Sequence, residues 1–263
     1  SISWKYDSRS GEYSHEQNPY SIAGYYFLTD SKSKTATLSE RDGGATDGMT
    51  DITSFDEHAV YEQDLYSPGS TGRLFLGEDF RYNASQNFTF ELPGVDNSAP
   101  VKLRTAFGAK VVGGNSKLIF THNGETLPES NPDNISSGSE SSYDFVKTTS
   151  TLKEIHLDSE ELDFNLLFRQ NGGSLTLARL DYFRFNYKRK LQLYNGSLQF
   201  RLAKLPENGC YNLQGYTPAI HIWDISNPQQ PVNIIPRNDN GNARFVPTKA
   251  NEEYIAFDEQ ATV

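Results

Sequence analysis

Cys210 is the side chain with the clearest potential for covalent chemistry, because it is the one cysteine among 263 residues. A thiol becomes a nucleophile when a histidine lies within hydrogen-bonding reach or when nearby positive charge lowers its pKa. The segment Glu207–Tyr211 offers no basic neighbour, and nothing in the sequence brings any of the five histidines beside the thiol. We therefore interpret Cys210 as a small, half-buried loop residue and predict no catalytic residue in this chain.

Two other hydrolytic arrangements also find little support. The Gly-x-Ser-x-Gly elbow of serine hydrolases does not occur in the sequence. Glycoside hydrolysis needs two carboxyl groups on opposite sides of one bond. Glu125 and Asp181 lie near expected strand ends, but nothing distinguishes them from solvated surface acids.

Two acidic loops are candidates for calcium. One is Asp42–Asp51, with Asp47 and Asp51, and the other is Asn238–Asn242, with Asp239. The second loop imitates part of an EF-hand, but prolines occupy the two terminal positions where carboxylates are required, so an EF-hand is excluded. A looser calcium site remains open, and a turn held by Asn and Asp side chains is the favoured alternative. No other cofactor is expected, and no Cys or His spacing suits zinc.

Exposed aromatic rings are the third kind of candidate, because sugar rings stack on them. Trp4, Tyr6 and Trp223 are available, and Trp223 ends the run 220–223, in which His221 and Trp223 share one face and two isoleucines share the other. One of those faces must be core. We favour a packed Trp223, and we keep sugar binding at Trp223 and His221 as the alternative.

Basic residues gather near the end of one long strand, at Arg184 and in the run Lys188–Lys190. We interpret them as a solvated inter-domain seam, with a phosphate or lipopolysaccharide contact as the sharper alternative.

Composition sets outer limits on these readings. The formal charge is −10, which disfavours nucleic acid. No apolar run approaches the ~20 residues of a membrane helix, so no transmembrane segment is expected. Aromatic residues make up 13% of the chain, with 16 Phe and 15 Tyr, and these residues favour strands.

The elements that would position these side chains are strands. Asn-Gly pairs such as Asn123-Gly124 and Asn195-Gly196 predict type I′ hairpin turns. Residues 174–187 alternate with period two and predict a long strand that directs Phe183, Phe185 and Tyr187 to one face. Ser54–Leu65 is the best helix-period segment. The fold class we predict is all-β, an antiparallel jelly-roll-like β-sandwich with flanking smaller β units.

We divide the chain into three pieces. Residues 1–66 form an N-terminal β segment with one clear strand at Gly24–Thr29 and a mobile loop at Ser31–Thr53. Residues 67–189 form the sandwich, and residues 190–263 form a second β unit. Its last strand, Tyr254–Phe257, stands so near the chain end that we expect more protein to follow.

Five segments in order resemble one family, the type IX secretion system sortases of Bacteroidetes, which are gingipain-type cysteine peptidases. The segments are His15–Thr29, Tyr61–Phe80, Leu180–Leu191, Ile222–Pro228 and Glu253–Phe257. Each motif is weak alone, and the order across nearly the whole chain carries the resemblance. One departure from the family is Ser67-Pro68-Gly69, which stands where the family usually has an apolar run.

The resemblance implies the non-catalytic N-terminal region of such a sortase. The family's catalytic His and Cys would then lie in a peptidase domain beyond Phe257, and Cys210 matches no catalytic motif of the family. The implied location is extracytoplasmic, at the outer membrane surface after transit through the periplasm. The implied partners are the chain's own C-terminal peptidase domain, an outer-membrane β-barrel and secreted cargo.

Three functions follow as hypotheses. The first is an accessory region that supports the peptidase domain and docks a partner or cargo. The second is a carbohydrate-binding β-sandwich module of a surface glycan system. The third, an independent hydrolase, would require turnover that depends on Cys210.

Overall fold

A computed structural model describes residues 2–18, 38–127, 129–135 and 145–260. The described residues form strands and one short 3₁₀ turn, η1 (Pro68–Ser70), and include no α-helix. The expected all-β antiparallel sandwich with smaller β units is confirmed.

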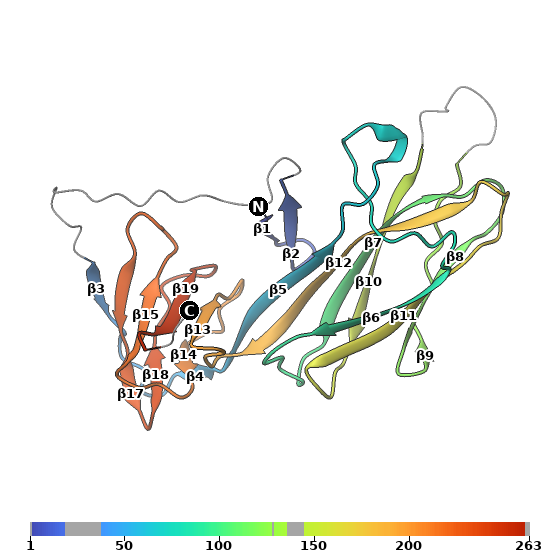
Figure 1. Ribbon diagram of the computed structural model, residues 1–263. Helices are drawn as coiled ribbons and strands as arrows, with labels where there is room; N and C mark the ends of the chain where they lie inside the picture. The colour runs from blue at the N-terminus through green and yellow to red at the C-terminus, as the bar shows by residue number, and fades with distance from the viewer. Residues whose placement is uncertain (1, 19–37, 128, 136–144, 261–263) are drawn as a thin grey trace. The chain divides into compact units, whose positions relative to one another are not determined.

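Contacts divide the chain into two units, each built from separate stretches of sequence (Figure 1). Unit 1 consists of residues 1–57, 93–96 and 188–263, and unit 2 consists of residues 58–92 and 97–187. Most of the first piece expected from the sequence (1–66) and all of the third (190–263) thus contribute to one unit. The sandwich expected at 67–189 supplies most of the other.

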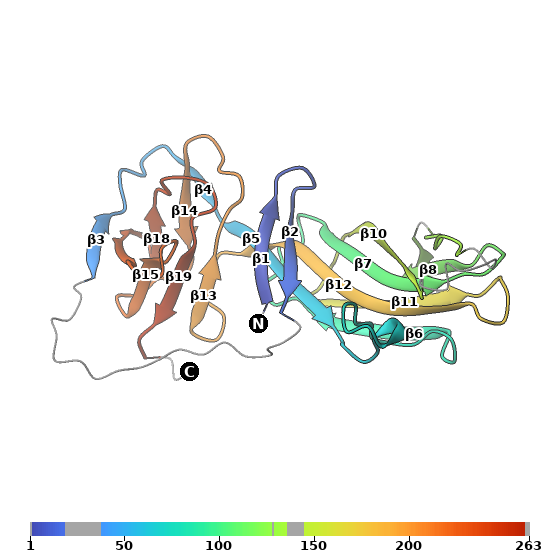
Figure 2. The ribbon, with the colours of Figure 1, turned by 90° about the horizontal axis from the view of Figure 1, so that it is seen from above.

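Unit 2 is a sandwich of two four-stranded sheets, with orders β10-β7-β12-β5 and β6-β11-β8-β9 (Figure 2). β7 pairs antiparallel with β10 and β12, and β11 pairs antiparallel with β6 and β8. The strands of the first sheet are β5 (Ser54–Glu62), β7 (Val101–Lys110), β10 (Lys147–Ile155) and β12 (Leu177–Lys190). The strands of the second are β6 (Ser85–Glu91), β8 (Lys117–His122), β9 (Glu125–Thr126) and β11 (Glu161–Arg169).

Phenylalanine rings fill the space between these sheets. As predicted from the alternation, β12 directs Phe183 and Phe185 inward, where they are 0% and 2% exposed. Phe88 of β6 and Phe164 of β11 meet Phe183 from the other sheet, with ring centroids 4.8 and 5.0 Å away. Phe90 lies 4.8 Å from Phe185. Most of these pairs are edge-to-face, the arrangement that aromatic quadrupoles favour.

Unit 1 contains a five-stranded sheet of order β13-β19-β15-β16-β3 and a four-stranded sheet of order β17-β18-β14-β4. The first consists of β3 (Ser39–Asp42), β13 (Ser197–Phe200), β15 (Ile220–Asp224), β16 (Val232–Ile235) and β19 (Tyr254–Asp258). The second consists of β4 (Thr50–Ile52), β14 (Gly209–Leu213), β17 (Arg237–Asp239) and β18 (Asn242–Phe245). The N-terminal stretch supplies one edge strand to each sheet, since β3 runs parallel to β16 and β4 parallel to β14.

The core of unit 1 lies between these two sheets and is richer in tyrosine. Phe200 and Tyr254 come from the five-stranded sheet, and Tyr211 and Phe245 come from the four-stranded sheet. The ring centroids of Phe200 and Tyr211 lie 5.2 Å apart, and those of Phe245 and Tyr254 also lie 5.2 Å apart. A hairpin of β1 (Ile2–Asp7) and β2 (Glu12–Gln17) belongs to the same unit.

The predicted Asn-Gly turns are present. Asn123 and Gly124 join β8 to β9 with φ of 49° and 77°, the positive values that a type I′ turn needs. Asn195 and Gly196 have φ of 53° and 81°.

The helical pattern read at Ser54–Leu65 was wrong, because Ser54–Glu62 is strand β5. Its neighbour β12 supplies a hydrogen-bonding ladder, and Phe55, Val60 and Tyr61 are residue types that favour a strand. Part of the loop expected at Ser31–Thr53 forms β3 and β4. The strand predicted at Gly24–Thr29 lies outside the described residues.

Candidate functional sites

Cys210 lies inside unit 1, on β14, rather than in a half-buried loop, and it is 0% exposed. Its thiol lies 3.6 Å from Asp51 Oδ1, and Arg244 Nη2 lies 3.3 Å from the sulfur. Burial raises the pKa of the thiol, and the opposing effect of Arg244 does not offset it. Among the described residues no histidine is a polar partner of this sulfur. The site therefore favours the neutral thiol and offers no histidine as a base.

The three aspartates considered for calcium gather around two arginines of one sheet. Arg244 Nη2 lies 2.6 Å from Asp51, and Arg244 Nη1 lies 3.5 Å from Asp239. Arg237 Nη1 lies 2.8 Å from Asp47. Within the described ranges, no group of three acidic, His or Cys side chains is arranged to hold a metal ion. A calcium ion would have to compete with these arginines, so calcium remains a prediction.

The loop that imitates an EF-hand is a tight hairpin between β17 and β18. Asn240 and Gly241 have φ of 52° and 83° and lie between the paired residues Asp239 and Asn242. Asn238 Oδ1 accepts a hydrogen bond from the backbone N–H of Gly241 at 3.1 Å. This is the turn held by Asn and Asp side chains that the sequence favoured.

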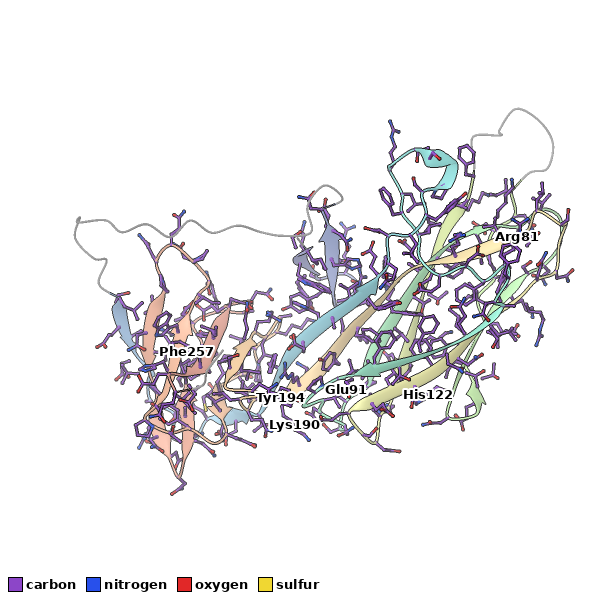
Figure 3. The ribbon with its side chains drawn as sticks, viewed as in Figure 1. Arg81, Glu91, His122, Lys190, Tyr194 and Phe257 are labelled. Atoms are coloured by element: carbon purple, nitrogen blue, oxygen red, sulfur yellow. The ribbon has the colours of Figure 1, made fainter. Side chains whose placement is uncertain are left out.

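His221 and Trp223 lie together on the outer face of the five-stranded sheet. Ile220 and Ile222 point into the core, at 7% and 1% exposed, while His221 and Trp223 are partly exposed. The expectation of a core Trp223 was therefore wrong: the apolar isoleucines take the inner face. Phe257 lies beside both rings, 5.0 Å from Trp223 and 5.5 Å from His221 between centroids, and Figure 3 marks it on β19.

Two members of the basic cluster meet acids of unit 1. Lys188 Nζ lies 2.6 Å from Asp56 Oδ1, and Arg189 Nη1 lies 2.9 Å from Glu57 Oε2. Because these charges are neutralised by neighbouring carboxylates, little is left for a phosphate group at this point. In unit 2, Arg184 is 8% exposed and lies 5.5 Å from the ring centroid of Tyr182.

The acids considered for glycoside hydrolysis belong to different sheets of unit 2. Glu125 is exposed at the start of β9 and pairs with His122 across the turn. Asp181 stands at the register shift between β12 and β7. Nothing in these positions gives either carboxyl group a distinct role.

Sequence reasoning missed the charged contacts around Arg201. Arg201 is 7% exposed, and its Nε donates to the two oxygens of Glu253 at 2.8 and 2.7 Å. Its Nη1 lies 3.6 Å from Glu57, and its guanidinium lies 5.9 Å from the ring centroid of Tyr13 on the hairpin. The one sequence signal is its place directly after the alternating strand β13.

A second missed feature is the buried carboxylate of Glu252, which is 5% exposed. It accepts hydrogen bonds from the backbone N–H groups of Thr248 and Lys249 at 2.9 and 3.3 Å, and from the hydroxyls of Thr248 and Tyr254. Burial pushes the pKa of this carboxyl upward, but the hydrogen bonds outweigh burial and hold the pKa below its usual value.

Unit 2 contains a small, mainly apolar cavity of about 10 Å³ between its sheets. Lys153 reaches it from β10 and lies 5.7 Å from the ring centroid of Phe120. Burial lowers the pKa of Lys153. Alternation along β10 places this lysine on the inner face, a position that sequence reasoning did not notice.

The chain is thus an all-β protein of two units, and its one thiol is buried. The described residues include no catalytic arrangement that we recognise. No helix in the described ranges is long and apolar enough to span a membrane. No protein-family model matches the chain, and no curated protein matches it.

Comparison with solved structures shows a similar fold over the whole chain. The crystal structure of dimeric latent PorU from Porphyromonas gingivalis matches with a TM-score of 0.84 and 21% identity. The match covers 100% of this chain and 26% of that chain, so this chain spans about a quarter of its length. The expected likeness to a type IX secretion sortase is thus confirmed at the level of fold.

Two carbohydrate-binding structures match much less well. One is the CBM36-1 domain of a multidomain xylanase from the hindgut metagenome of Trinervitermes trinervoides. The match covers 49% of this chain and 96% of that chain, with 11% identity and a TM-score of 0.30. The other is CBM36 in complex with calcium and xylotriose. That match covers 51% of this chain and 99% of that chain, with 12% identity and a TM-score of 0.27. At these scores neither supports an argument about this chain.

Proposed function

We propose that this chain is a non-catalytic accessory region of a type IX secretion system sortase. Its role is to support the peptidase domain and to dock a partner or cargo at the outer membrane surface. The observation that carries the proposal is the match to PorU over the full chain at a TM-score of 0.84.

The segments that resemble the sortase family support this proposal because they build the fold. Leu76 and Phe80, from the second segment, are 0% and 1% exposed. Leu180 of the third segment is 0% exposed, and Tyr254 and Ala256 of the last are 0% exposed. Buried positions constrain the packing of a domain rather than its chemistry.

The buried thiol gives independent support for a non-catalytic role. Cys210 is 0% exposed and contacts Asp51 and Arg244. Because a substrate carbonyl cannot reach a sulfur without solvent access, this cysteine does not act as a peptidase nucleophile without local unfolding.

An edge strand supports a docking role. Among the described strands, β10 stands at the edge of its sheet and has β7 as its neighbour. Leu152 on β10 is 41% exposed, and Tyr82 elsewhere in unit 2 is 85% exposed. Open edges and exposed apolar side chains are the features by which β domains add a partner segment.

The first test is to read the gene beyond the codon for Val263. The proposal expects a gingipain-type peptidase domain with its own Cys and His, and a stop codon at that point contradicts it. The second test deletes residues 1–263 from the gene and follows removal of the C-terminal signal from secreted cargo by immunoblotting. Cargo that retains its signal is expected. Cys210→Ala, the matched control, should process cargo normally, and normal processing by the deletion would contradict an accessory role.

A further inference from the structure

The outer face of the five-stranded sheet in unit 1 carries an aromatic corner. β15 and β19 pair antiparallel, so that His221 lies opposite Phe257 and Trp223 lies opposite Ile255. All four side chains are partly exposed, whereas their chain neighbours Ile222, Tyr254 and Ala256 are buried. The alternation that builds the core therefore leaves a row of rings on the opposite side of the same two strands.

Two of the three rings stand at right angles to each other. The planes of Trp223 and Phe257 meet at 87°, with centroids 5.0 Å apart, so the edge of one faces the other. His221 lies 5.5 Å from Phe257 at a tilt of 33°. An aromatic face carries negative charge density and its edge positive charge density. A saturated ring can place its C–H bonds on one ring face while its rim touches the second ring.

Hydrogen-bonding pairs surround this corner on the same face of the sheet. His221 Nε2 lies 3.1 Å from Glu259 Oε2. Asn233 of β16 is opposite Trp223, and Gln199 of β13 is opposite Ile255. The amide of Asn233 donates to Glu40 at 3.3 Å, and the amide of Gln199 donates to Glu253 at 2.7 Å.

The chemistry of this rim selects a ligand class. Side-chain amides donate hydrogen bonds to hydroxyls and accept hydrogen bonds from them, and carboxylates accept them. A few such groups around apolar rings are what small-ligand sites use to fix orientation. Glu40 and Glu259 place two carboxyl groups beside the corner, which repel an anionic ligand, whereas Arg201 offsets the charge of Glu253. A neutral ring with many hydroxyls and one apolar face meets all of these conditions.

We propose that the face formed by His221, Trp223, Ile255 and Phe257 binds a neutral saccharide by stacking a pyranose ring on the aromatic corner. The site does not depend on the sortase proposal, because it needs only the folded unit 1. Each contact of this kind is weak, so a dissociation constant on the order of 0.1–1 mM is expected for a short oligosaccharide.

The test uses the small number of tryptophans. Trp4 and Trp223 are the two in the chain. In a Trp4→Phe variant, Trp223 becomes the one indole that fluoresces. Cellohexaose, maltohexaose and mannohexaose are titrated against this variant, and hexagalacturonate serves as the anionic comparison. We expect a saturable change in Trp223 emission with at least one neutral hexasaccharide. The affinity for hexagalacturonate should be weaker by about tenfold or more.

Calorimetry on the otherwise natural chain then locates the site. Trp223→Ala and Phe257→Ala should each weaken binding by about tenfold or more, and the matched control Trp4→Ala should leave it unchanged. Far-UV circular dichroism confirms that each variant is folded. Equal affinity in Trp223→Ala, or no emission change with any neutral sugar at 10 mM, overturns the proposal. A change in Trp223 emission with protein concentration in the absence of sugar would also overturn the proposal, because it would show that a second copy covers this face.

Discussion

The two units build their cores from different chemistry. Unit 2 packs phenylalanines, and Phe183 contacts Phe88, Phe90 and Phe164 at centroid distances of 4.8–5.8 Å. Unit 1 places charged and hydroxyl groups against its rings. There, Arg41 Nη2 donates to Tyr254 Oη at 3.2 Å. The difference separates stability that comes from apolar burial from stability that depends on ionised groups being satisfied.

This comparison teaches how each unit should respond to change. Apolar burial is indifferent to pH and falls with each ring that is removed. A buried ion pair responds strongly to the loss of one partner, because the other charge is left in a poorly solvated place. The units should therefore differ in which substitutions they tolerate and in how they respond to acid.

The largest expected effect comes from Phe183→Ala in unit 2. Phe183 is 0% exposed and stands at the centre of the ring cluster. Its loss removes apolar burial and leaves a cavity, which costs about 4 kcal/mol of unfolding free energy. Urea unfolding followed by far-UV circular dichroism measures this loss. Tryptophan fluorescence reports on unit 1, where both Trp4 and Trp223 lie, and its midpoint should move less. Equal shifts of both signals would break the comparison.

Arg201→Met tests the charged side of the comparison. The substitution keeps the stem of the side chain and removes the partner of Glu253 and Glu57, so about 3 kcal/mol should be lost from unit 1 at pH 7. Arg237→Met is the matched control. The Arg237–Asp47 pair has side chains 51% and 79% exposed, and its loss should cost about 0.5 kcal/mol. Urea unfolding followed by tryptophan fluorescence measures both. Similar losses in the two variants would show that Arg201 contributes no more than a surface pair.

Much of this fold follows from period-two alternation and turn chemistry. The rings of β12 share one face as predicted, and Asn123-Gly124 closes a hairpin with both residues at positive φ. The helix pattern at Ser54–Leu65 was misleading because Phe55, Val60 and Tyr61 fit either period. The sheet partner β12, far away in sequence, decided for a strand. The sequences of edge strands β3 and β4 show no strand pattern. These polar segments form strands because the sheets offer them an edge to pair with.

The candidate sites were less predictable, since they depend on which strands meet. Asp51 and Asp239 are 188 positions apart in the chain, and the pairing of β4, β14, β18 and β17 in one sheet brings both to Arg244. The alternation correctly placed His221 and Trp223 on one face, but it did not say which face was core. The face with Ile220 and Ile222 is the core face, because burying two aliphatic side chains removes no polar group from water.

Glu252→Gln sharpens the comparison through pH. The pKa of Glu252 lies below its ordinary value of 4.5, so the ionised carboxylate stabilises the folded state above that pH. This contribution is lost as the pH falls through the lowered pKa. We expect the variant to lose about 2 kcal/mol at pH 7 and the gap from wild type to narrow below pH 4.5. Denaturant unfolding across pH 3–7 measures the gap. A constant gap for Glu252→Gln would mean that its carboxyl titrates normally when folded.

Calcium provides the smallest expected effect, because the candidate ligands of unit 1 already have partners. A site with a dissociation constant of about 1 mM would add about 1.4 kcal/mol at 10 mM calcium. We expect the tryptophan-detected unfolding midpoint of the wild type to stay unchanged when calcium replaces EGTA, because Arg244 and Arg237 hold the three aspartates. Arg244→Gln frees Asp51 and Asp239, and it should acquire a stabilisation by calcium that magnesium does not reproduce. If instead the wild type gains about 1 kcal/mol and Asp51→Asn does not, the aspartates bind calcium in preference to arginine. The charged side of the comparison would then include a metal ion.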